Sequence, residues 1–161
     1  MERNLWGNLD AIVNEINNPK DILVEQAEYL KESLNGLVRC KVMREHLSNE
    51  WIQFYGKLDV ICDFTFSFKI LSDYVENYEY EICRLTYGIK MYPLAISFGT
   101  GIAEELEEMF IIVDGDTIIV DGEENLFNVL QKILSSNEVH QVLKGLISIA
   151  KKESGLRDLP F

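Results

Sequence analysis

The stretch from residue 57 to residue 70 constrains the fold of this chain more than any other. Its even positions, from Leu58 to Ile70, are all apolar, and its odd positions are polar apart from Ile61. Successive side chains of a strand point to opposite faces, so this alternation predicts a strand with one buried and one solvated face. Similar runs at 78–87 and 91–98 follow after brief connections, which predicts an antiparallel meander.

Helices are expected at the N-terminal end of the chain. Residues 3–17 have apolar side chains at three- and four-residue spacing, which predicts a short amphipathic helix. Asn18 and Pro19 then provide an N-cap and a first helical residue, and Asn35-Gly36 provides a left-handed stop. These signals predict a second, well-delimited helix.

Two further helices are expected near the C-terminus, one capped by Asp121 and one starting at Asn137, with fraying from residue 151 onward. The length of 161 residues suits one domain, residues 1–161. The predicted fold class is therefore α+β, with N-terminal helices, an antiparallel meander sheet of about five to six strands and two C-terminal helices.

The segments before and after the long strand allow more specific predictions. Residues 37–45 alternate as a strand with a basic outer face, and residues 51–56 are expected to enter the long strand with a break or bend near Gly56. Pro93 cannot donate a ladder hydrogen bond, so its strand is expected to lie at an edge or to be irregular there. Apolar residues change face around Cys83, which predicts a bulge or burial on both faces.

The region after the meander is expected to form a turn and a small hairpin. Residues 99–104 read as a flexible turn because of their two glycines. Asp114-Gly115 lies between the apolar runs 109–113 and 117–120, and Asp-Gly in that position is a strong hairpin signal.

Composition and charge restrict the function classes. The net charge of −12 disfavours general binding to nucleic acid and to anionic membrane surfaces, which attract clustered Lys and Arg. No apolar run is as long as a membrane span, and the start of the chain lacks the apolar core of a signal peptide, so a cytoplasmic protein is expected. An acidic chain can bind a basic partner, although acidity also serves solubility.

Cysteine usage points to structural thiols. Cys40, Cys62 and Cys83 are odd in number, fall in predicted strands and form no CxxC pair. Neither His46 nor His140 is close to them in sequence, so no metal site is expected. Buried free thiols suit a reducing compartment. No cofactor is predicted.

An acidic segment is the candidate binding site. No basic residue occurs between Lys90 and Lys132, and such a one-sign segment raises the negative potential that steers a basic partner. The alternative is a solvated face with carboxylates that stabilise helix N-termini. The candidate partner-binding residues are Glu104, Glu105, Glu107, Glu108, Asp114, Asp116, Glu123 and Glu124.

The same segment does not match a calcium-binding loop. Counting from Asp114, the fifth position is Ile118 and the twelfth is Asn125, where oxygen-rich ligands and a bidentate Glu are required. A solvated turn followed by a helix cap explains the residues instead.

No arrangement of residues predicts catalysis. The chain has no GxSxG, no phosphate-binding loop and no cysteine in a reactive context, so no catalytic residue is assigned. Five tyrosines could line a ligand or partner surface, or could form cross-strand pairs within the sheet. They are Tyr74, Tyr78, Tyr80, Tyr87 and Tyr92.

Three segments resemble a group of small bacterial domains without an assigned activity. These segments are 18–38, 78–82 and 88–93, and the first is a capped helix that leads into a strand. The resemblance implies a helix followed by a meander, and it implies no active-site residue.

These observations lead to one functional hypothesis and two rivals. The first is a non-enzymatic protein-binding module that engages a basic protein through the segment 104–124, a description that fits antitoxin-like or immunity-like proteins. The second is a small enzyme or small-ligand binder with a pocket between sheet and helices, which a polar pocket with converging carboxylates or a histidine would favour. The third is self-association through the strand edge at Pro93 or through the C-terminal helix.

Overall fold

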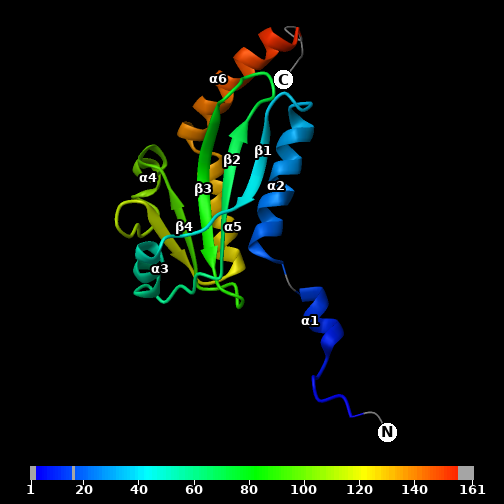
Figure 1. Ribbon diagram of the computed structural model, residues 1–161, viewed down its shortest axis with the longest axis vertical. Helices are drawn as coiled ribbons and strands as arrows, with labels where there is room; N and C mark the ends of the chain where they lie inside the picture. The colour runs from blue at the N-terminus through cyan, green and yellow to red at the C-terminus, as the bar shows by residue number, and fades with distance from the viewer. Residues whose placement is uncertain (1–2, 16, 156–161) are drawn as a thin grey trace.

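A computed structural model describes residues 3–15 and 17–155 of the chain (Figure 1). It contains a five-stranded antiparallel sheet in the order β1-β2-β3-β4-β5. This arrangement confirms the predicted α+β fold with N-terminal helices, a meander and two C-terminal helices. The elements in chain order are α1 (Leu9–Glu15), α2 (Pro19–Ser33), β1 (Arg39–Arg44), α3 (Asn49–Gly56), β2 (Phe64–Leu71), β3 (Glu79–Tyr87), β4 (Leu94–Phe98), α4 (Thr100–Leu106), β5 (Thr117–Val120), α5 (Glu123–Leu134) and α6 (Asn137–Ser154).

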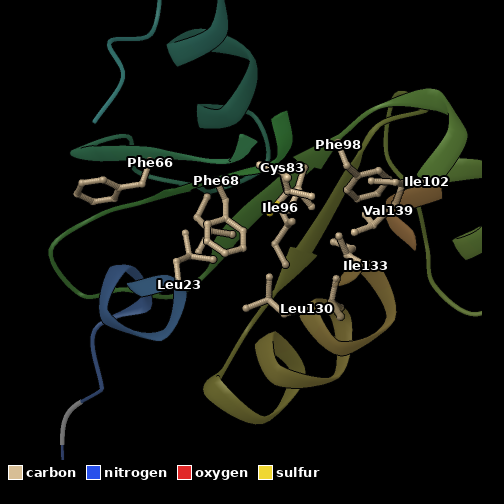
Figure 2. Packing of buried hydrophobic residues seen from close by; sticks show 14 of the residues in the cluster. Leu23, Phe66, Phe68, Cys83, Ile96, Phe98, Ile102, Leu130, Ile133 and Val139 are labelled. Atoms are coloured by element: carbon tan, nitrogen blue, oxygen red, sulfur yellow. The ribbon is translucent and has the colours of Figure 1, made fainter. Parts of the chain in front are cut away.

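The main core lies between one face of the sheet and helices α2, α5 and α6. Figure 2 shows Leu23 of α2 and Leu130 of α5 directed toward the strand residues Phe68 and Ile96. All four side chains are buried. The alternating strand pattern supplies the sheet side of this core, and the apolar stripes of the helices supply the other.

A smaller apolar cluster lies on the opposite face of the sheet. Tyr55 of α3 and Val60 pack there against Ala95 of β4, with Phe54 and Ile119 at the margin. Helix α3 therefore covers the β4 and β5 side of this face, whereas the β1 and β2 side carries charged residues.

The predicted limits of α2 are confirmed. The Asn18 side chain accepts a hydrogen bond from the Lys20 backbone N–H at 3.0 Å, and Pro19 occupies the first helical position. After the helix, Asn35 and Gly36 both have positive φ, 51° and 76°, which the left-handed stop requires.

The predicted bulge in β3 is also confirmed. Phe68 of β2 pairs with Cys83, but the next residue, Lys69, pairs with Glu81. Ile82 is therefore the extra residue of the bulge, and the local change of face lets both Ile82 and Cys83 be buried.

The prediction that residues 51–56 enter the long strand is wrong. They belong to α3, which begins after Ser48, whose hydroxyl accepts from the Trp51 N–H at 3.4 Å. The rings of Trp51, Phe54 and Tyr55 pack against one another in edge-to-face and tilted contacts, as helical spacing allows and strand spacing does not. The chain does break near Gly56, as expected.

The first half of the predicted long strand is wrong as well. Strand β2 starts at Phe64, and residues 57–63 form a connection in which Asp59 has a φ of 61°. Leu58, Val60 and Cys62 still alternate inward because this connection packs against the α3 cluster. Cys62 consequently lies in a loop, unlike the other two cysteines.

Pro93 immediately precedes β4 and does not lie at an edge of the sheet. Strand β4 is flanked by β3 and β5, so the edge strands are β1 and β5. The Tyr92–Pro93 peptide bond is cis. The edge alternative for Pro93 is wrong because β5 returns along β4 and covers it, but the predicted strand is irregular there, since β4 begins only at Leu94.

Residues 99–104 form the start of α4 and not a flexible turn. Ile102, Ala103 and Leu106 are buried, and this helical spacing fixes the segment on the core. The predicted hairpin turn exists, because Asp114 and Gly115 have positive φ and Val113 bridges Thr117. Residues 109–112 are not a strand.

The C-terminal helices match the prediction apart from the cap of α5. Gly122 is the N-cap, without a side-chain hydrogen bond, and Asp121 instead accepts from the Asn125 side chain at 2.5 Å. Helix α6 begins at Asn137 as predicted and continues to Ser154, past the expected start of fraying. Residues 156–161 lie outside the described residues. At the other end, α1 starts at Leu9 and is shorter than predicted, and residue 16 is not described.

Candidate binding surfaces

The eight predicted acidic residues do not form one surface. Glu104, Glu105, Glu107 and Glu108 lie on α4 or directly after it, and the β5 turn carries Asp114 and Asp116. Glu123 and Glu124 begin α5, at the far end of β5, whose four residues span on the order of 10 Å. The eight residues are close along the sequence because β5 is short, but β5 separates the α4 residues from the start of α5 in space.

Glu105 has a structural role. Its carboxylate accepts hydrogen bonds from the backbone N–H groups of Asn137 at 2.7 Å and Glu138 at 3.0 Å. These are unpaired donors of the first turn of α6, so α4 caps α6 through Glu105. The sequence could not show this contact, because 32 residues separate Glu105 from Asn137.

Replacing Glu105 with alanine is expected to lower the free energy of unfolding by about 1–2 kcal/mol, because the cap and its favourable interaction with the helix dipole are lost. Glu104→Ala is the matched control, since Glu104 is exposed on the same helix and forms no side-chain hydrogen bond or ion pair within the described residues. Its effect should stay within about 0.5 kcal/mol. Urea unfolding measures both, and equal effects would contradict the cap.

Two more of the predicted acidic residues form hydrogen bonds within the chain. Asp116 accepts from the Thr117 hydroxyl at 2.9 Å, and Glu123 accepts from the Asn17 side-chain amide at 2.7 Å. Glu124 is exposed but is distant from the α4 residues along the chain.

Four acidic residues remain free around α4. Glu104, Glu107, Glu108 and Asp114 are exposed and form no side-chain hydrogen bond or ion pair within residues 3–15 and 17–155. Two apolar side chains lie in the same segment: Met109 is half exposed and Ile111 is 88% exposed. Exposed apolar side chains rimmed by polar ones are typical of interaction sites. We call these six residues the α4 surface.

The outer face of β1 to β3 carries paired charges. Lys41 bonds with Glu79, Lys69 lies 3.6 Å from Glu45, and Arg84 bonds with Glu81 at 2.9 Å. Arg39 likewise pairs with Asp73. The basic residues predicted on the outer face of β1 are therefore there, but acidic side chains pair with Arg39 and Lys41 and neutralise their charge.

Glu45 illustrates the electrostatics of this face. The buried Ser67 hydroxyl donates to the Glu45 carboxylate at 2.8 Å, and this bond, followed by the nearby Lys69, holds the pKa of Glu45 below its ordinary value. A carboxyl group whose pKa is lowered by folding stabilises the folded protein at pH values above its ordinary pKa. This stabilisation is lost as the pH falls through the lowered pKa.

Ser67→Ala is therefore expected to destabilise the protein in a pH-dependent way. At pH 7 the loss should be about 1–2 kcal/mol, since a hydrogen bond to a charged group is removed. Below pH 4 the difference from the wild type should shrink as Glu45 becomes protonated. Urea unfolding at pH 7 and at pH 3.5 measures it, and Thr86→Ser, which keeps a hydroxyl on the same face, serves as control. A pH-independent difference would contradict this account.

A polar groove of about 560 Å³ lies beside α3 on the same face. His46, Glu81, Arg84 and Asp116 border it, together with the rings of Trp51 and Tyr55. Burial raises the pKa of Tyr55, while the adjacent Ser97 lowers it, so the phenol stays protonated. Sequence reasoning missed this groove because α3 was expected to be a strand; the cap at Ser48 was the available signal.

An apolar groove lies on the opposite side of the molecule, between α2 and the C-terminal helices. One part, of about 460 Å³, is lined by Ile22, Phe127 and Leu130. It meets a second part of about 320 Å³ whose floor is the sheet, including Phe68 and Ile70. Gln26 and Leu134 line both parts. We call the whole cavity the α2 groove.

The five tyrosines do not form one surface. Tyr74 and Tyr78 lie in the β2–β3 connection, whereas Tyr87 and Tyr92 lie near the opposite end of β3. Tyr87 is buried and packs against Phe64 and Phe66, so cross-strand packing explains it.

The three cysteines are free thiols. Burial raises the pKa of Cys40 to about 12 and also raises the pKa of Cys62 and Cys83. Because the thiolate is the reactive form, these side chains act as apolar fillers. Within the part of the chain that the structure describes, no group of three or more His, Cys, Asp and Glu side chains is placed to hold a metal ion.

None of the helices in the described ranges has both the length and the apolar character needed to cross a bilayer. Comparisons with protein-family models, with curated proteins and with solved structures found no match to this chain. The resemblance to small bacterial domains therefore stays a prediction.

Proposed function

We propose that this protein is a non-enzymatic binding module that engages a basic protein partner through the α4 surface. The observation that carries the proposal is the combination of four free carboxylates with two exposed apolar side chains, Met109 and Ile111, in one segment. Apolar contact supplies affinity and the carboxylates supply steering and specificity. An antitoxin-like or immunity-like role fits such a module. The three free thiols, of which Cys83 is buried and Cys40 and Cys62 are partly buried, support a reducing compartment, the cytoplasm.

The absence of basic residues from this part of the chain strengthens the electrostatic argument. Lys90 and Lys132 bracket 41 positions without Lys or Arg, and within the described residues no carboxylate of the α4 surface forms an ion pair. Their field is therefore directed at the solvent and is available to a cationic partner. Glu105, Asp116 and Glu123 are left out of the proposed site because they bond within the chain.

A four-fold variant tests the proposal. Glu104→Gln, Glu107→Gln, Glu108→Gln and Asp114→Asn together remove the charges, and Glu105 is kept so that the fold is preserved. The control removes four exposed carboxylates elsewhere: Glu25→Gln, Glu28→Gln, Glu32→Gln and Glu76→Gln. Affinity capture from the native cell lysate, followed by mass spectrometry, is compared at low and at moderate salt.

Wild type and control should retain the same basic protein at low salt, and moderate salt should release it because exposed charges are screened. The four-fold variant should not retain it. Recovery of nothing at either salt, or equal recovery by both variants, would contradict the proposed site. Met109→Ser with Ile111→Ser should weaken capture without changing its salt dependence.

The polar groove beside α3 favours the second candidate, a small-ligand binder. His46 and the guanidinium nitrogens of Arg84 that Glu81 leaves free can bind a carboxylate, the second carboxylate oxygen of Asp116 an ammonium group, and Trp51 an aromatic ring. An aromatic amino acid carries all three groups. A thermal-shift titration with phenylalanine, and with phenethylamine and 3-phenylpropionate as single-charge analogues, tests this candidate. A shift with phenylalanine alone that is lost in Trp51→Ala would support it.

A further inference from the structure

Residues at the start of the described chain carry apolar side chains that have no partner. Leu5, Trp6 and Val13 are 91%, 80% and 74% exposed, and Leu9 and Ile12 are about half exposed. Figure 1 shows α1 beyond the N-terminal end of α2, away from the sheet and the other helices. So many exposed apolar side chains in one short segment are rare on a protein without an interaction at that site.

The contacts at the start of α2 hold residues 17 and 18 on the body of the protein. Asn18 is extended, with φ −71° and ψ 134°, as a residue before proline prefers. Its side-chain oxygen also accepts from the Tyr87 hydroxyl at 2.7 Å, and Asn17 donates to Glu123 at 2.7 Å. These bonds hold residues 17 and 18 in place, and α1 projects beyond them (Figure 1).

The α2 groove is a matching apolar surface that its own chain leaves unfilled. The part that opens between α2 and α5 has an apolar wall of Ile22, Phe127, Leu130 and Leu134, and its remaining lining residues are Gln26, Gln131, Ser135 and His140. Phe127 is nearly half exposed on that wall. Helical grooves with such walls accept an amphipathic helix through side chains at i, i+3, i+4 and i+7. Within α1, Leu9, Ile12 and Val13 have the spacing i, i+3 and i+4, and Leu5 and Trp6 precede the helix.

We propose that α1 of a second copy of this chain occupies the α2 groove, so that two copies exchange their N-terminal segments reciprocally. The exchange is two-fold, since each copy offers one segment and one groove. Burying one large apolar side chain removes on the order of 100 Å² from water. Five such side chains per copy, together with the groove walls they cover, give on the order of 2,000 Å², which is enough for a stable dimer.

This interface goes beyond the proposed function because it uses a different surface. The α4 surface contains none of the residues of α1 or of the α2 groove. A dimer would therefore present two α4 surfaces at once and raise the avidity for a repeated or dimeric partner.

Three variants of the full chain test the exchange by sedimentation velocity across a range of concentrations. Leu9→Glu with Val13→Glu alters the segment, and Phe127→Glu alters the groove. Val24→Glu with Ile149→Glu is the control, because both side chains are exposed and line neither feature. Circular dichroism and thermal unfolding establish that each variant is folded.

The wild type and the control should sediment as dimers, and the segment and groove variants as monomers. An equimolar mixture of those two variants should recover a dimer with one intact contact, at about half of the total yield or less. Monomeric wild type at every concentration would overturn the proposal, as would a dimer that both variants leave intact. Monomeric wild type whose Trp6 fluorescence, in a Trp51→Phe background, is that of a buried indole would show that α1 occupies the groove of its own chain.

Discussion

Leu23→Ala is expected to cost about 2–5 kcal/mol of unfolding free energy. Leu23 lies on the inner side of α2, is fully buried, and points at the sheet beside Phe68 (Figure 2). Truncation removes apolar burial and leaves a cavity, because the sheet cannot collapse onto a helix whose ends are fixed by Asn18 and Gly36.

Urea unfolding followed by circular dichroism measures this effect, and the neighbouring residue provides the control. Val24 is exposed on the same helix, so Val24→Ala should change the stability by less than about 0.5 kcal/mol. A cost below about 1 kcal/mol for Leu23→Ala would show that α2 is not held against the sheet as described.

Asn18→Ala is expected to cost about 2–3 kcal/mol, which is more than the loss of a helix cap alone. The Asn18 oxygen accepts from the Lys20 N–H, and it also accepts from the hydroxyl of Tyr87, a buried residue of β3. The substitution removes the cap and leaves the Tyr87 hydroxyl as a buried donor without its acceptor, and each of these losses costs about 1 kcal/mol or more.

A double-mutant cycle with Tyr87→Phe separates the two contributions. In a Tyr87→Phe background, Asn18→Ala should cost only the cap, about 1 kcal/mol. Additive costs for the two substitutions would contradict a direct bond between the side chains. Asn18→Asp keeps an acceptor oxygen and should retain most of the stability.

Elements with strong local signals were predicted well from sequence. Helix α2 has an N-cap, a proline at its first position and a left-handed stop, so its limits were predicted within about one residue. The β3 bulge was predicted because Ile82 and Cys83, adjacent in sequence, are both apolar where alternation allows only one inward residue.

Prediction failed where tertiary packing gave a segment its conformation. Residues 57–63 alternate as a strand would, yet they form a connection that buries Val60 under α3. The α4 segment was taken for a turn because of Gly99 and Gly101, but burial of Ile102 and Leu106 stabilises a helix there. Alternation and glycine content report local preference, and burial against distant residues overrides it.

The candidate binding site was likewise predicted in part from local sequence and in part only visible in the tertiary structure. Sequence identified the acidic segment, since charge is visible in composition. It could not separate Glu105, which caps α6, from Glu104 and Glu108, which face the solvent. The α2 groove and the polar groove beside α3 join residues from distant parts of the chain, so no local pattern could indicate them.

The sequence by itself determined the α+β class, the order of helix, meander and C-terminal helices, and the net negative charge, because periodicity, capping residues and composition act over a few neighbouring residues. Only the tertiary structure decided which carboxylates are free, which strands are edges, and which apolar surfaces stay uncovered. Those properties depend on contacts between residues 32 to 106 positions apart, and a chain brings such residues together only when the whole core forms.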